Sequence, residues 1–224
     1  MPTAVHALAH CPLTADAVAE LVALPFGPLV DEDDAIDEEM RRRGWDWEPE
    51  LVCDSFRTGH GHVLCSEDFS PFGNRQDRAF LVFGEVYPVD PQDAAMANAT
   101  WLEGYMDGWE QAPGWSARRP ATAQDCEAVL ARAAGAVTEI LGRDPERTLV
   151  SDHTVGFGLA LTHRVWRTPT HALILGPSPD EGPYGYLVHL QLSQTPLSGA
   201  PGLPPAGEEH EETLAAWITA HTTW

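Results

Sequence analysis

Two cysteines and two histidines near residue 60 could supply sulfur and nitrogen ligands to a metal ion. They are Cys53, His60, His62 and Cys65, spaced as C-x6-H-x-H-x2-C. The spacing differs from the common zinc motifs, and alternation along a strand would turn Cys65 away from the face that His60 and His62 share. We therefore expect no metal ligands here, while a histidine-based, metal-dependent hydrolase stays open as an alternative function.

Nucleophilic catalysis has little support in the residue pattern. The chain has no G-x-S-x-G motif, and Ser151, Asp152 and His153 merely follow one another, whereas catalytic triads are assembled from separated positions. The glycine pair Gly59 and Gly61 lacks the third glycine and the following helix of a dinucleotide-binding loop. We expect no enzymatic activity, no catalytic residue and no cofactor.

Acidic side chains dominate the charge. The chain has 34 aspartates and glutamates against 13 basic residues, a net charge of −21, and every basic residue is an arginine. Phosphate-bearing partners would be repelled, so nucleic acid and anionic membranes are not expected partners. The absence of lysine is typical of GC-rich coding, in which acidity is also common. The charge is therefore either functional or a background of composition, and both readings stay open.

Acidic and aromatic side chains suggest how the chain could bind a protein. An acidic run comprises Asp31, Glu32, Asp33 and Asp34. Trp101 and Trp109 lie in a polar stretch where exposed rings are plausible, although core positions are the alternative. Aromatic anchors surrounded by carboxylates suit a basic protein partner. These six residues are the predicted partner-binding set, and the oligomeric state is left open.

Four helices are predicted from hydrophobic spacing and end signals. The clearest covers residues 122–141, where Thr122 and Asp125 resemble a capping box and Gly142 is a natural stop. The others are expected near residues 14–24, 31–43 and 208–221. The periodicity of the helix at residues 122–141 predicts that both Leu130 and Ile140 are buried.

Six strands are predicted in two groups of three. They cover residues 51–56, 60–65, 79–86, 155–165, 171–175 and 184–192. Residues 176–183 are rich in glycine and proline and should form a turn, so each group reads as an antiparallel meander.

The two halves follow the same order of helix and meander. Thr14 corresponds to Thr122, and Pro88 to Pro196, at an offset of 108 residues, while His62 corresponds to His171 at nearly the same offset. We therefore expect an α+β fold with helices packed on one face of antiparallel sheet, and two divergent repeats or a chance similarity.

Three segments follow from this organisation. They are a first α+β half (residues 1–90), an aromatic-rich connector (91–120) and a second α+β half with a C-terminal helix (121–224). The four cysteines form no disulfide framework, and the chain shows neither a signal peptide nor a membrane-length apolar run. We expect a cytoplasmic protein.

Aromatic and aliphatic residues gather in four places: the corner at residues 44–47, the pair Trp166 and Arg167, and the strand-like runs 171–175 and 183–192. Together with the order of helix and meander, these features cover about half of the chain and resemble those of actinobacterial polymorphic-toxin immunity proteins. The resemblance implies an antidote that binds and blocks a cognate protein toxin, and the acidity would fit a basic toxin. It carries over no functional residue. The alternative is a secretion chaperone or adaptor.

Overall fold

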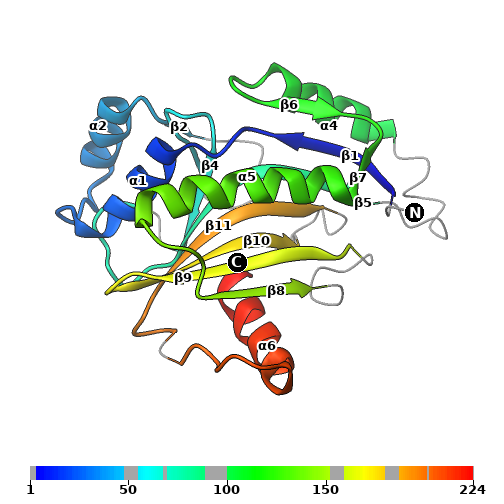
Figure 1. Cartoon of the computed structure of the whole chain (residues 1–224). Coiled ribbons are helices and arrows are strands. Elements are labelled where there is room, and N and C mark those ends of the chain that lie inside the picture. Colours follow the sequence, from blue (N-terminus) through cyan, green and yellow to red (C-terminus); the bar gives the residue numbers. More distant parts are fainter. Residues whose placement is uncertain are drawn as a thin grey trace.

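The computed structural model describes residues 4–47, 55–67, 70–88, 100–151, 159–179, 187–200 and 202–223. Within these ranges, five α-helices accompany one eleven-stranded sheet, which confirms the predicted α+β class (Figure 1). The strands are β1 (Ala4–His10), β2 (Asp46–Trp47), β3 (Ser55–Arg57), β4 (Val63–Ser66), β5 (Ala79–Pro88), β6 (Ser116–Arg118), β7 (Ala121–Thr122), β8 (Arg147–Ser151), β9 (Leu161–Arg167), β10 (His171–Pro179) and β11 (Val188–Pro196). The helices are α1 (Ala15–Ala23), α2 (Asp33–Arg43), α4 (Thr100–Gln111), α5 (Ala123–Leu141) and α6 (Glu211–Thr222), with short 3-10 turns η1 (Leu24–Phe26) and η2 (Glu208–His210).

Two four-stranded meanders meet in the middle of the sheet. The strand order is β2-β3-β4-β5-β11-β10-β9-β8, and all these neighbours pair antiparallel. Read from either edge, the order is the same: a meander whose last strand reaches the centre. The segments 1–90 and 121–224 therefore contribute to a single sheet, while β1 pairs with β5, β6 and β7 beside it.

The correspondences between the halves fall at equivalent points of the fold. Thr14 and Thr122 each cap a helix with their side chain. Pro88 and Pro196 are the last residues of the two central strands. This agreement supports the interpretation of the halves as divergent copies.

Helix α5 forms where its end signals predict it. Thr122 and Asp125 make a reciprocal capping box, and Gly142 ends the helix in the left-handed conformation at a φ of 65°. Cys126, Val129, Leu130, Ala133 and Val137 are the buried side chains of the helix. Ile140 is 37% exposed, so its predicted burial is wrong: its spacing from Ala133 and Val137 places it on the buried side, but it lies in the last turn of the helix, where solvent reaches it.

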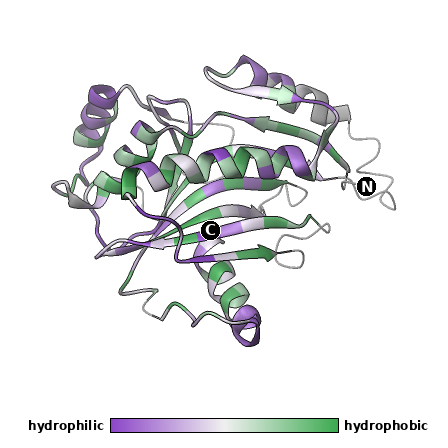
Figure 2. Cartoon of the chain, viewed as in Figure 1, coloured by the Kyte–Doolittle hydropathy of each residue, from purple (hydrophilic) through white to green (hydrophobic). Residues whose placement is uncertain are grey.

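Helices cover both faces of the sheet, which corrects the prediction of a single covered face. Helices α1, α2 and α5 share one apolar cluster with Leu81 and Phe83 of β5. Phe80 and Val82 of the same strand point the other way and pack with α4, while α6 packs over β8 to β10. The physical reason is that β5 is apolar on both sides, so that both sides need a cover. In Figure 2 green is interrupted by purple along the strands, while α2 is largely purple.

Several elements differ from the predicted ones. Helix α4 and five strands were not predicted; these strands are β1, β2, β6, β7 and β8. In addition, β10 continues to Pro179 through residues expected to turn. Strand β1 includes the histidines His6 and His10. The predicted strand positions 51–54, 155–158 and 184–186 lie outside the described residues. No helix in the described ranges has the length and apolar character to cross a membrane.

Candidate binding surface

Helix α2 presents an acidic surface because its two large apolar residues both face inward. Ile36 and Met40 are buried in the main core, and Gly44 ends the helix in the left-handed conformation at a φ of 68°. The outward side carries six exposed carboxylates, which we call the acidic face of α2: Asp31, Glu32, Asp33, Asp34, Asp37 and Glu38. The four acidic residues predicted from the sequence are thus exposed. Asp33 and Asp34, in the first turn, also interact favourably with the helix dipole.

The charges of α2 are separated along the helix. At its C-terminal end, Glu39 accepts hydrogen bonds from Arg42 Nε at 2.7 Å and from Arg43 Nε at 2.6 Å. The bond from Arg42 and the neighbouring Arg43 lower the pKa of Glu39 to about 2. In the described structure, no ion pair joins the acidic face of α2 to any residue. The acidic N-terminal end of α2 therefore keeps its negative charge, which an approaching partner could meet.

Two large apolar side chains flank this helix in the sequence and reach solvent. Leu29 is 56% exposed before the helix, and Trp47 is 43% exposed just after it. Trp47 lies on β2, the outermost strand of its side of the sheet, and its ring packs against Phe56 at 4.8 Å between centroids. A partly exposed ring held from one side suits an interface anchor.

The predicted tryptophan anchors lie elsewhere. Trp109 is buried, with its ring 3.9 Å from that of Trp115 and the guanidinium of Arg57 5.6 Å above it. The packing of α4 against the sheet encloses it, so the expectation of an exposed ring at Trp109 is corrected. The backbone of Trp101 belongs to α4, but its side chain lies outside the described part. Among the residues described, Trp47 is the tryptophan with a clearly exposed side chain, and it was not in the predicted partner-binding set.

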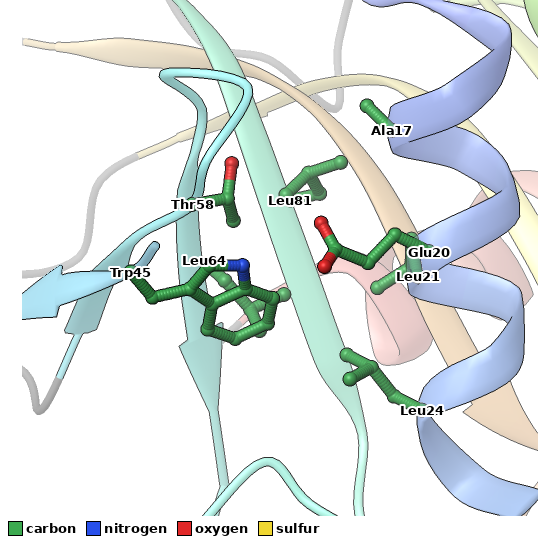
Figure 3. A pocket seen from close by; sticks show the side chains of 8 residues that line it. All are labelled: Ala17, Glu20, Leu21, Leu24, Trp45, Thr58, Leu64 and Leu81. Atoms are coloured by element: carbon green, nitrogen blue, oxygen red, sulfur yellow. The ribbon is translucent and has the colours of Figure 1, made fainter. Parts of the chain in front are cut away.

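A narrow hollow lies beside this surface, between α1 and the strands that follow α2 (Figure 3). We call it the Trp45 hollow; its lining residues are Ala17, Glu20, Leu21, Leu24, Trp45, Thr58, Leu64 and Leu81. The space between these atoms is about 200 Å³ with the mouth included, but the walls stand too close for a free water molecule. Mostly aliphatic walls with a few polar groups are the usual composition of a ligand site.

Charged groups gather at the mouth of the hollow. A carboxylate oxygen of Glu20 lies 3.5 Å from Arg43 Nη1, and its other oxygen lies 3.6 Å from His60 Nε2. The Arg43 guanidinium also lies over the rings of Trp45 and Phe72, at 5.5 and 5.1 Å from their centroids. Arg43 therefore connects the C-terminal end of α2 to the hollow.

Two polar groups inside the hollow have no partner. The indole nitrogen of Trp45 and the hydroxyl of Thr58 are buried without a hydrogen bond. Figure 3 shows the nitrogen-bearing side of the Trp45 ring turned toward the Glu20 carboxylate, with Thr58 on the same side of the hollow as Trp45. No sequence pattern predicts this grouping, because Glu20 lies on α1, Trp45 follows α2, and Thr58 lies between β3 and β4.

The cysteine and histidine group near residue 60 is divided in space. His62 Nε2 lies 3.0 Å from the carbonyl oxygen of Pro12, and burial lowers the pKa of His62 to about 4. His60 lies beside Glu20, and Cys65 is buried in the core under α4. Cys53 is outside the described residues. Among the residues described, no three histidine, cysteine or acidic side chains are grouped to hold a metal ion.

Two further buried polar sites lie within the sheet. Glu85 and His189 face each other across β5 and β11, with Oε1 and Nδ1 2.8 Å apart. His163 Nε2 lies 2.8 Å from the carbonyl oxygen of Pro177, and its ring occupies the space that a side chain at Gly176 would need. Their burial separates these groups from any substrate.

Comparison with protein-family models, with curated proteins and with solved structures gave no match in any of the three cases. Similarity to other proteins therefore assigns no role to these residues.

Proposed function

We propose that the chain is a binding protein that neutralises a cognate protein toxin, and that it does not catalyse a reaction. The observation that carries the proposal is the acidic face of α2, six exposed carboxylates flanked in the sequence by the exposed side chains of Leu29 and Trp47. Charge attracts and orients a basic partner, and apolar anchors hold it once it has docked. The resemblance to immunity proteins agrees with this arrangement.

Charged and apolar side chains would contribute to binding in different ways. Rim charges act mainly on the rate of encounter, whereas desolvated aromatic and aliphatic side chains supply most of the affinity. The net charge of −21 acts in the same direction for the whole molecule. A basic toxin is therefore the partner that the chain would attract over the longest distance.

The proposal is tested by co-expression with the product of the adjacent gene. Growth rescue by the chain, and a complex that co-purifies, are the expected results. The matched variant is Trp47→Ala, which should weaken the complex at least tenfold through faster dissociation if Trp47 is an anchor. Failure of rescue, together with no complex with any neighbouring product, would contradict the proposal.

A further inference from the structure

The Trp45 hollow holds two buried hydrogen-bonding groups that the free chain leaves unused. Trp45 is 2% exposed and Thr58 6% exposed, yet neither the indole nitrogen nor the hydroxyl has a partner. Buried polar atoms are bonded in the great majority of cases, and a buried tryptophan N–H usually finds an acceptor. Two such groups in one hollow indicate an occupant that supplies the missing bonds.

The chemistry of the lining defines this occupant. The indole N–H of Trp45 can only donate, the Thr58 hydroxyl can donate and accept, and the Glu20 carboxylate at the mouth can only accept. A ligand must therefore offer both an acceptor and a donor. Leu21, Leu24 and the other aliphatic walls favour a short hydrocarbon stem behind that polar group.

Charged ligands fit less well than neutral ones. An ammonium group has no lone pair for the Trp45 N–H, and it would meet Arg43 beside Glu20. A carboxylate would be pushed away by Glu20 and has no hydrogen to donate to it. A neutral amide avoids both conflicts because its carbonyl accepts and its NH₂ group donates.

We propose that the Trp45 hollow binds a primary carboxamide on a short aliphatic stem. The carbonyl oxygen accepts from Trp45 Nε1, and the NH₂ group donates to Glu20 and to the hydroxyl of Thr58. Because the closed hollow has no room for water, Glu20 must turn outward to admit the ligand. Its contacts with Arg43 and His60 are long, at 3.5 and 3.6 Å, and hold it loosely. This site functions whether or not a protein partner docks on α2.

The test follows the indole N–H resonance of Trp45 in the ¹⁵N-labelled full chain, assigned by its loss in Trp45→Phe. Propanamide, propionate and propylamine are titrated separately to about 0.1 M, since a ligand this small binds in the millimolar range. Propanamide should shift the resonance in a saturable way, and the two ions should not. No saturable shift with propanamide, or equal shifts with all three, would overturn the proposal.

Thr58→Val removes the hydroxyl and keeps the shape of the side chain. Losing one hydrogen bond should weaken propanamide binding about five- to tenfold. The midpoint of thermal unfolding of the ligand-free variant should stay the same or rise, because the hydroxyl is unbonded in the free chain. The exposed Thr148, on β8, provides the control variant Thr148→Val, which should bind normally. Unchanged affinity in Thr58→Val would refute the assigned site.

A glutamine side chain carries the same carboxamide as propanamide, so one further titration distinguishes the two sources. N-acetylglutamine N-methylamide presents that group on a peptide backbone. Binding of both compounds assigns the site to a peptide side chain, and binding of propanamide alone assigns it to a small molecule.

Discussion

Leu130 and Ile140 show how strongly the position on one helix determines the effect of a residue. Leu130 is a fully buried residue of α5, whereas Ile140 of the same helix is partly exposed to solvent. Leu130→Ala should lower the free energy of unfolding by about 2–5 kcal/mol, because it removes buried atoms and leaves a cavity. Ile140→Ala should lower it by less than about 1 kcal/mol. Urea unfolding of both variants checks the difference, and equal losses would mean that the buried side of α5 is assigned wrongly.

Two buried histidines predict how stability depends on pH. Burial lowers the pKa of His62 and of His163 to about 4, from 6.5. Below pH 6.5 these histidines are protonated in the unfolded chain but stay neutral in the folded chain. The free energy of unfolding therefore decreases as the pH is lowered from about 6.5 to about 4, where the folded histidines also become protonated. The loss should reach up to about 3 kcal/mol for each histidine near pH 4.

Urea unfolding between pH 7 and pH 4 measures this loss. In His62→Gln the pH dependence should become less steep, because one of the two histidines is removed while a side-chain N–H that can donate to Pro12 is kept. A variant with the same pH profile as the parent chain would show that His62 does not stay neutral in the folded state.

The acidic ends of α2 and α6 allow a charge-matched comparison of two elements. Neutralising Asp31, Glu32, Asp33 and Asp34 to the corresponding amides should slow association with the partner about tenfold at low salt, and leave dissociation nearly unchanged. Helix α6 begins in an equally exposed acidic group, comprising Glu208, Glu209, Glu211 and Glu212. The same neutralisation there removes as much net charge. Stopped-flow mixing at several salt concentrations compares the two variants, and an equal slowing in both would refute the assignment of α2 as the docking helix.

Local signals predicted the elements that carry them and missed those formed by distant pairing. Helix α5 has a capping box at its beginning and a glycine at its end, and β5 is a long apolar run. Both elements were therefore predicted correctly. Strand β1 carries three alanines, which have a weak strand preference, and forms because β5, β6 and β7 pair with it. Prolines 177 and 179 suggested a turn, but pairing with β11 keeps that segment extended.

The candidate site was predicted in the same uneven way. The exposure of Asp31 to Asp34 follows from polarity alone, and the structure bears it out. Burial of Trp109 depends on how α4 packs, which composition does not encode. The Trp45 hollow depends on the meeting of Glu20, Trp45 and Thr58, which are far apart in the chain.

At the scale of the whole molecule, the Glu85–His189 pair connects the two halves at the centre of the sheet. Both side chains are almost completely buried, and Oε1 and Nδ1 lie 2.8 Å apart. Replacing only Glu85 with alanine should cost about 3–5 kcal/mol, because it leaves the histidine buried without this carboxylate. The double variant Glu85→Leu, His189→Leu should lose less than that.

A double-mutant cycle on the free energy of unfolding measures this coupling. Additive losses in the cycle would mean that the two side chains do not interact energetically, and that other contacts alone join the halves.

The mirrored order of strands also has an evolutionary meaning. If the meanders descend from one gene, the ancestral unit would have paired its last strand with that of an identical copy, in a symmetric homodimer with a continuous sheet. Joining the two copies in one chain would then have freed each from the other's constraints. Only the first half acquired an acidic helix between its capped helix and its meander. Under the proposed function, one half would recognise an asymmetric partner, while the other keeps the long helix α5 that packs on the sheet.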